Sequence, residues 1–93
     1  MKSNIRLAFA RLAVQDVREI LQYTNEQWGR RQRNAYFGEL KRAARQLQAF
    51  PEMGRLTDEG VRELVVQRHI VLFRHPDDVV TIRRVLTPRR LRQ

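Results

Sequence analysis

The sequence contains no cysteine, only two lysines among nineteen basic residues, and no apolar run that approaches the length of a membrane span. The lack of cysteine excludes disulfide frameworks and thiolate metal sites. The lack of a run of about 18 apolar residues argues against a transmembrane helix, and the first residues have no apolar segment of the kind found in signal peptides. A soluble, cytoplasmic protein is therefore expected.

Acidic residues are also scarce. Ten Asp and Glu face nineteen Arg and Lys, which gives a formal net charge of +9 on 93 residues. Such an excess favours an anionic partner, either a nucleic acid or an acidic protein segment. A coding sequence rich in G and C would explain the choice of arginine over lysine, but it explains the shortage of acidic residues less well.

The hydrophobic pattern changes its period along the chain. Apolar side chains alternate within residues 4–9, as in a strand, whereas from Ala13 to Trp28 they recur every three or four residues, as in an amphipathic helix. Gly29 and Pro51 are typical of helix ends. The predicted elements are, in order, a strand at 4–9, helices at 10–28 and 31–49, a loop at 51–60, and strands at 61–67, 70–73 and 79–86.

This β-α-α-β-β-β order predicts an α+β fold in a single domain spanning residues 1–93, with 89–93 as a flexible basic tail. The helices should form an antiparallel hairpin packed on one face of a small, curved, mainly antiparallel sheet. The opening strand must pair into that sheet because it has no other partner. The other face of the sheet is left open. The predicted core residues are Val17, Ile20, Trp28, Tyr36, Leu40, Leu47, Ile70, Leu72 and Ile82.

A set of residues stands in fixed order along these elements. Its members are Ala13-x-x-Asp16-Val17-x-x-Ile20-x-x-Tyr23, Trp28-Gly29, Tyr36-x-x-x-Leu40, Leu47-x-x-x-Pro51-x-x-Gly54-Arg55, Gly60-x-Arg62, His69-Ile70-x-x-Phe73-Arg74 and Val80-x-Ile82-x-Arg84-Val85-Leu86. This set resembles the ParE-like toxins of the RelE/ParE superfamily, which belong to type II toxin–antitoxin systems. Each piece is common by itself, but the ordered set covers nearly the whole chain and is specific.

The resemblance implies a toxin that inhibits growth by binding and blocking DNA gyrase, without chemistry of its own, and that a cognate antitoxin neutralises. We expect a flexible, acidic and apolar C-terminal segment of the antitoxin, whether ParD-like or of another type, to dock along the hairpin and sheet. The charge of +9 and the small core of a short chain agree with such a partner, in a toxin–antitoxin hetero-oligomer.

Arginines of the last strands and the C-terminus are the predicted contacts to the target or the antitoxin. Arg84 is of special interest because it is expected on the same side of its strand as Val80 and Ile82, where an unpaired charge is costly. Asp16 is expected to hydrogen-bond locally or to pair with a nearby arginine. The predicted contact residues are Arg62, Arg68, Arg74, Arg83, Arg84, Arg89 and Arg90.

The alternative function is that of the RelE-like toxins, which cleave mRNA on the ribosome. Cutting RNA through the 2′-hydroxyl needs a base, an acid and cations for the phosphate. Arg62, His69 and Arg84 are the candidates for these roles, with the strand arginines binding the scissile phosphate. No tyrosine follows Tyr36, however, and Thr87 stands where ParE relatives often carry histidine. Binding is therefore favoured over cleavage; a toxin-like module with another target, or without toxicity, stays open.

Three further expectations concern single side chains. Trp28 should cap the core of the hairpin and not act as a stacking platform for a base. His69, at the start of an apolar strand, has a structural interpretation as well as a catalytic one. The sequence predicts no metal site and no cofactor, because His69 and His75 are the only two histidines and no third ligand accompanies them.

Overall fold

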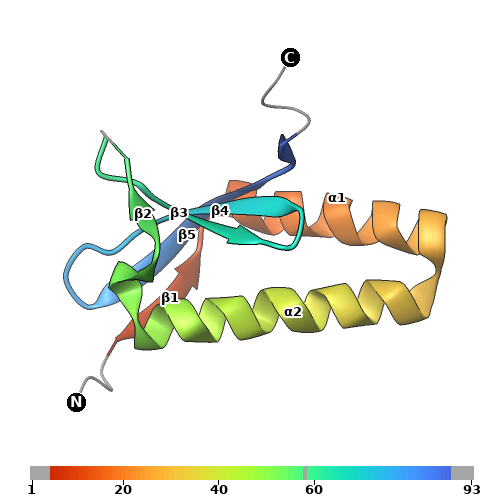
Figure 1. The fold of residues 1–93 in the computed structure, drawn as a ribbon, viewed down its shortest axis with the longest axis horizontal. Coiled ribbons are helices and arrows are strands. Elements are labelled where there is room, and N and C mark those ends of the chain that lie inside the picture. The colour runs from red at the N-terminus through yellow and green to blue at the C-terminus, as the bar shows by residue number, and fades with distance from the viewer. Residues whose placement is uncertain (1–4, 58, 89–93) are drawn as a thin grey trace.

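The computed structural model describes residues 5–57 and 59–88, which form a helix hairpin and a five-stranded sheet (Figure 1). The predicted tail, residues 89–93, lies outside the described residues. The elements are β1 (Arg6–Phe9), α1 (Arg11–Trp28), α2 (Arg30–Ala49), the short 3-10 helix η1 (Pro51–Met53), β2 (Arg55–Leu56), β3 (Arg62–Val66), β4 (His69–Arg74) and β5 (Val79–Leu86).

The strands are arranged in the order β1-β5-β4-β3-β2, with β1 parallel to β5 and all other neighbours antiparallel. This confirms the α+β fold, the helix hairpin and the mainly antiparallel sheet. The opening strand does pair into the sheet, and its partner is the last strand of the chain.

One part of the predicted loop at 51–60 is regular structure. η1 and β2 both lie in it, and β2 pairs with β3 through Arg55 opposite Glu63 and Leu56 opposite Arg62. A strand of two residues is defined by its hydrogen bonds to the neighbouring strand. It is too short to show an alternating pattern, so the sequence does not predict it.

A single glycine joins the two helices. Its N–H donates to Asn25 O and so closes α1, and its carbonyl accepts from Arg33 N at the start of α2. Gly29 has φ +93°, a backbone conformation that residues with a side chain rarely adopt, so the tight hairpin depends on glycine at this position. Neither described helix is long and apolar enough to cross a membrane.

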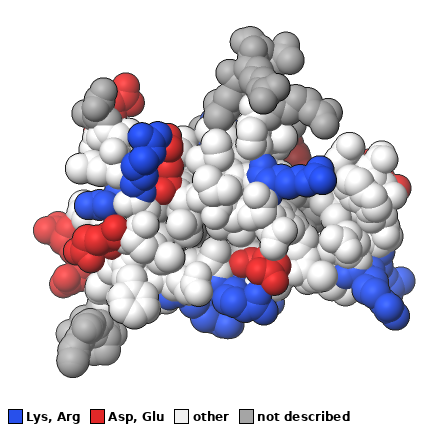
Figure 2. All heavy atoms as spheres, in the orientation of Figure 1, with Lys and Arg blue, Asp and Glu red and all other residues white. Residues whose placement is uncertain are grey.

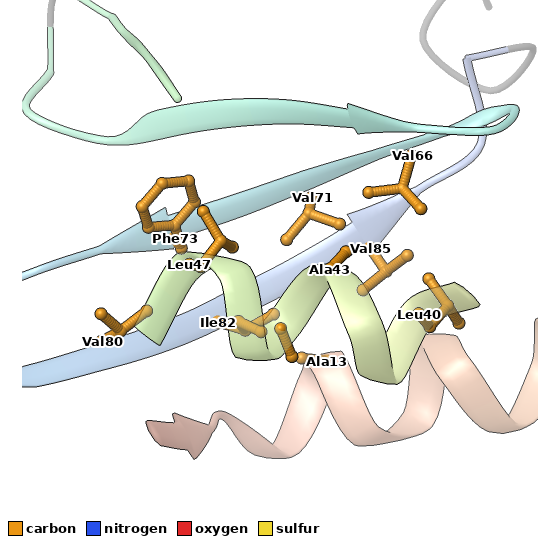
Figure 3. Packing of buried hydrophobic residues seen from close by; sticks show 11 residues of the cluster. Ala13, Leu40, Ala43, Leu47, Val66, Val71, Phe73, Val80, Ile82 and Val85 are labelled. Atoms are coloured by element: carbon orange, nitrogen blue, oxygen red, sulfur yellow. The ribbon is translucent and has the colours of Figure 1, made fainter. Parts of the chain in front are cut away.

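The core lies between the hairpin and one face of the sheet (Figure 3). Its largest fully buried side chains are Phe73, Leu47 and Val80, from β4, α2 and β5. Two alanines side by side on α2, Ala43 and Ala44, are almost fully buried and let this helix approach the strands closely. The buried cluster consists of Ala13, Leu40, Ala43, Ala44, Leu47, Val66, Val71, Phe73, Val80, Ile82 and Val85.

The predicted core residues on the helices meet different fates. Leu40 and Leu47 belong to the buried cluster, and Val17, Ile20 and Tyr36 are half-buried against it. The prediction for Trp28 is wrong, because 60% of this residue is exposed. In Figure 1 the two helices extend side by side past the strands, so the end of α1 has no sheet beneath it to cover a large ring.

In strand β4 the buried residues differ from those that the sequence predicted. Val71 and Phe73 face the core, whereas Ile70 and Leu72 are half-buried, so placing these two in the core was wrong. A continuous apolar run hides which of its alternate residues point to the helices.

In β5 the expected alternation is broken by a register shift. Ile82 lies opposite Phe73, but Arg84 lies opposite Leu72, which leaves Arg83 without a counterpart. Val80, Ile82 and Val85 are therefore the buried residues of this strand. Arg84 shares its face with Leu72 and not with Val80 and Ile82, which corrects the expectation from the sequence.

Candidate binding surfaces

Arg84 and Asp16 form the most buried ion pair of the described residues. Arg84 Nε lies 2.7 Å from Asp16 Oδ2 and Nη2 lies 3.0 Å from Oδ1, a two-pronged arrangement that fits guanidinium to carboxylate. The carboxylate side chain is 7% exposed and the guanidinium side chain 37%. The hydrogen bond that Arg84 donates to Asp16 is the main reason why the pKa of Arg84 is raised. The pairing of Asp16 with an arginine, one of two alternatives for this residue, is thus realised.

The same carboxylate also completes the hydrogen bonding of β5. β1 pairs with β5 only as far as Ile82, whose carbonyl accepts from Ala10 N. Beyond that point, Val85 N donates to Asp16 Oδ2 at 2.9 Å. A side chain of α1 therefore takes the place that a further residue of β1 would have. Asp16 satisfies a buried backbone donor and a charged side chain at once, so we assign Arg84 a structural role first.

Two other predicted contact residues also bind their own chain. Arg62 Nη1 donates to Gly54 O at 3.0 Å and to Glu52 O at 3.4 Å. Arg74 Nη2 donates to Glu59 O at 3.2 Å. Both guanidinium groups thus hold backbone carbonyls of the connection between α2 and β3. They stabilise this segment, and part of their hydrogen-bonding capacity is already used.

The remaining predicted arginines are differently placed. Arg68, in the turn between β3 and β4, and Arg83, at the register shift, are exposed and have no hydrogen-bond or ion-pair partner within the described part of the chain. Arg89 and Arg90 lie outside the described residues. Of the predicted contact residues in the described structure, Arg68 and Arg83 are therefore the ones open to an external anion.

His69 and Tyr36 form a pair across the core. Tyr36 Oη is hydrogen-bonded to His69 Nδ1, and the two ring centroids lie 5.2 Å apart. Burial raises the pKa of Tyr36 to about 12. Burial, and secondarily the charge of Arg68, lower the pKa of His69. The Tyr36 hydroxyl is thus a poor proton donor at neutral pH, and it occupies one ring nitrogen of the histidine.

The three residues proposed for RNA cleavage are not brought together. Arg62 is paired with Phe73 at one end of the β3–β4 ladder, and His69 lies at the other end, opposite Val66. Four residues of strand separate these ends, or about 13 Å. Arg84 lies on β5 opposite Leu72, and its guanidinium is bound to Asp16 of α1. A single phosphate cannot contact all three side chains in this arrangement.

A surface recess between the hairpin and β1 was not foreseen from the sequence. It has a volume of about 250 Å³ and a mostly apolar lining that carries the cations Lys41 and Arg45 of α2. Lys41 Nζ lies 4.7 Å from the centroid of the Phe37 ring, a cation–π distance. Its lining consists of Leu7, Phe9, Val17, Phe37, Leu40, Lys41, Ala44 and Arg45. We call this site the hairpin recess.

The signals for this recess were present but weak. Lys41 follows Phe37 by four residues and Arg45 follows Lys41 by four, so the three lie along one face of α2. Basic side chains also gather along the lower edge of the molecule in Figure 2, over α2. Within residues 5–57 and 59–88, no group of three or more His, Asp or Glu side chains is placed to hold a metal ion.

The comparisons with known proteins agree with the fold and the ordered residues. A solved structure described as the chromosomal ParDE TA system from P. aeruginosa is similar to this chain, with a TM-score of 0.81 and 21% sequence identity over 90% of this chain and 96% of that one. At this identity the likeness concerns the fold. No curated protein matches the chain. The family model described as the ParE toxin of the type II toxin-antitoxin system parDE matches residues 7–92. The resemblance seen in the sequence is confirmed, and the chain belongs to the ParE toxin family of type II toxin–antitoxin systems.

Proposed function

We propose that this toxin stops growth in the cytoplasm by binding DNA gyrase and blocking its cycle, without making or breaking a covalent bond. The observation that carries this proposal is the separation of Arg62, His69 and Arg84, the candidate catalytic groups named from the sequence. His69 is hydrogen-bonded to Tyr36, Arg62 lies at the other end of the β3–β4 ladder and holds backbone carbonyls, and the Arg84 guanidinium is held by Asp16. Cations alone position a phosphate but do not move the protons that RNA cleavage requires.

Exposed arginines without partners supply the binding chemistry in this proposal. Among the predicted contact residues that the structure describes, Arg68 of the β3–β4 turn and Arg83 of β5 have an exposed guanidinium without a partner. Each can donate charge-assisted hydrogen bonds to carboxylates of a protein surface or to phosphates of gyrase-bound DNA. Arg89 and Arg90 are also proposed contacts, on the basis of sequence alone.

A paired assay tests the proposal. Purified toxin is added to a gyrase supercoiling reaction and, separately, to a translation mixture in which mRNA integrity is followed. We expect loss of supercoiling and intact mRNA. Replacement of Arg68 and Arg83 by alanine should weaken the inhibition while the melting temperature stays within a few degrees of that of the unmodified chain. Cleavage of mRNA at codon boundaries, with supercoiling unaffected, would refute the proposal.

We also propose that the cognate antitoxin neutralises this chain through a segment that enters the hairpin recess. The recess combines an apolar lining with Lys41 and Arg45. An amphipathic segment with apolar side chains on one side and carboxylates beside them matches both features. The net charge of +9 attracts such a segment over longer distances.

Charge reversal tests the antitoxin site. The double variant Lys41→Glu/Arg45→Glu should lower the affinity for the cognate antitoxin by tenfold or more, because it turns attraction beside the recess into repulsion. The variant Arg11→Glu/Arg18→Glu changes the net charge by the same amount on the exposed side of α1 and serves as the matched control. An equal loss of affinity in the two variants would be explained by the net charge alone. The recess would then not be the antitoxin site.

A further inference from the structure

The end of α1 exposes two aromatic rings. Trp28 is 60% exposed and Tyr23 53% exposed. Their ring centroids lie 6.0 Å apart at an interplanar angle of 78°, an edge-to-face contact. Trp28 is the only tryptophan of the chain. Single exposed apolar residues are ordinary, but a paired tryptophan and tyrosine on the surface is the composition of a binding site.

Basic side chains follow these rings directly. Gly29 ends α1, and Arg30 and Arg31 begin α2, both exposed and without a hydrogen-bond or ion-pair partner among the described residues. The first turn of α2 contains no acidic residue. Figure 1 places this turn at one end of the molecule, past the strands, and Figure 2 shows basic side chains gathered at the same end. We call Tyr23, Trp28, Arg30 and Arg31 the hairpin tip.

The geometry of the ring pair leaves Trp28 available to a flat ligand. In an edge-to-face pair, Tyr23 covers at most one face of the indole ring. The contact also restricts the rotation of the Trp28 side chain, so little conformational freedom is left to lose when a partner binds. Gly29, the next residue, has no side chain that could cover the ring.

We propose that the hairpin tip binds single-stranded nucleic acid, with a base stacked on Trp28 and the neighbouring phosphates held by Arg30 and Arg31. A flat exposed ring beside unpaired guanidinium groups fits the alternation of base and phosphate along a single strand. An acidic peptide would instead need an apolar recess for its side chains. The described recess with cations lies between the helices and β1, and none of its lining residues belongs to the tip.

This site is separate from the gyrase contact and from the antitoxin site proposed above. Its residues overlap neither with Arg68 and Arg83 nor with the hairpin recess. The site adds a nucleic-acid contact to a toxin that is otherwise expected to act on a protein. Its test does not depend on whether the toxin inhibits gyrase.

The only tryptophan reports on the proposed site directly. The full-length toxin is titrated with an oligo-dT strand of about ten nucleotides while Trp28 fluorescence is recorded at several salt concentrations. We expect quenching that saturates and weakens with salt. Inorganic polyphosphate, which carries the charge without bases, should bind without comparable quenching. Circular dichroism of each variant verifies that the helices are retained.

Substitutions separate stacking from charge, with binding of labelled oligo-dT followed by fluorescence anisotropy. Trp28→Ala should weaken oligo-dT binding about tenfold or more and leave polyphosphate binding unchanged. Arg30→Ala/Arg31→Ala should reduce the slope of log affinity against log salt by about 1.4 for two lost phosphate contacts. Arg11→Ala/Arg18→Ala removes the same charge elsewhere on the hairpin and should change that slope less. Unchanged oligo-dT binding in Trp28→Ala overturns the proposal, as does stronger Trp28-dependent binding of a poly-glutamate peptide, which would indicate a protein partner.

Discussion

The arginines of the sheet and those of the helix hairpin differ in what they contact. In the sheet, Arg62, Arg74 and Arg84 donate to carbonyls or to a carboxylate of the same chain. At the hairpin tip, Arg30 and Arg31 are exposed and have no such acceptor among the described residues. These three arginines of the sheet stabilise the fold, whereas Arg30 and Arg31 of the hairpin tip are presented to solvent.

The difference teaches that a residue type and its place in a strand do not reveal its role. Arg84 looked like a candidate for function because a charge in an apolar strand needs an explanation. Its explanation is Asp16, which lies 68 residues earlier in the chain. Arg30 and Arg31 looked like ordinary surface residues of a helix. Because exposed aromatic rings lie beside them, these two are better candidates for ligand binding than Arg84.

The largest expected effect comes from breaking the ion pair of the sheet. Arg84→Ala leaves the buried Asp16 carboxylate without its guanidinium and should lower the free energy of unfolding by about 2–3 kcal/mol. This is below the value for a fully buried pair, because Arg84 itself is partly exposed. Chemical denaturation measures the loss. Arg83→Ala, one residue earlier and without a partner in the described structure, should change stability by no more than about 0.5 kcal/mol. A similar loss of unfolding free energy in both variants would contradict a structural role that is specific to Arg84.

The second test compares a glycine packed in the sheet with one on the hairpin. A Cβ at Gly54 would lie 2.7 Å from a ring carbon of the buried Phe73 and 2.8 Å from Glu63 O. Gly54→Ala should therefore destabilise the protein by about 2 kcal/mol. Gly38, inside α2, has nothing within 4 Å of its Cβ position, and Gly38→Ala should stabilise by about 0.5–1 kcal/mol. Thermal unfolding of the two variants should shift in opposite directions; a shift in the same direction would be evidence against this packing.

A third prediction concerns the hydrogen bond that joins hairpin and sheet. Tyr36→Phe removes the hydroxyl that binds His69 Nδ1 and should cost about 1 kcal/mol of unfolding free energy at pH 7.5. Tyr23→Phe is the matched control, since the Tyr23 hydroxyl has no hydrogen-bond partner in the described structure. If Tyr36→Phe were as stable as the control, the bond would contribute nothing to the fold.

The same pair predicts a pH dependence. The pKa of His69 is lowered in the folded state, so below its unfolded value of about 6.5 the unfolded chain binds more protons than the folded one. Stability should therefore be fully present above that pH and fall as the pH decreases towards the folded pKa. His69→Gln should flatten the curve of unfolding free energy between pH 7.5 and 5. A curve of the same slope in this variant would assign the pH dependence to other groups.

The smallest expected effect belongs to the hairpin tip. Burial of a tryptophan in a core makes its replacement by alanine cost about 3–5 kcal/mol. Trp28 is largely exposed and contacts mainly one ring, so Trp28→Ala should cost less than about 1 kcal/mol. A calorimetric loss near 3 kcal/mol would restore the core position that the sequence suggested.

Much of the fold could be predicted from the sequence because the local spacing of apolar residues indicates the helices and strands. The steps of three and four from Ala13 onwards, and the change to short apolar runs after Gly60, are enough to place both helices and four strands. The family followed from residues in fixed order, which no single period could supply.

The features that were missed depend on contacts between distant residues. The choice between Ile70 and Val71 as the inward residue requires the register with β5, and the shift at Arg83 changes that register within one strand. Strand β2 is defined only by its pairing with β3. The exposure of Trp28 depends on how far the helices outreach the sheet, a length that only the assembled fold defines.

The pairing of β1 with β5 has a consequence for the order of events during synthesis. Within the described structure, β1 pairs with β5 and with no other strand, and Asp16 of α1 binds Arg84 and Val85 of that same strand. Strand β5 must therefore be synthesised before these contacts can form, and contacts of such long sequence separation form slowly. An incomplete chain would carry helices without their sheet. An activity that depends on these contacts would begin only after β5 has left the ribosome.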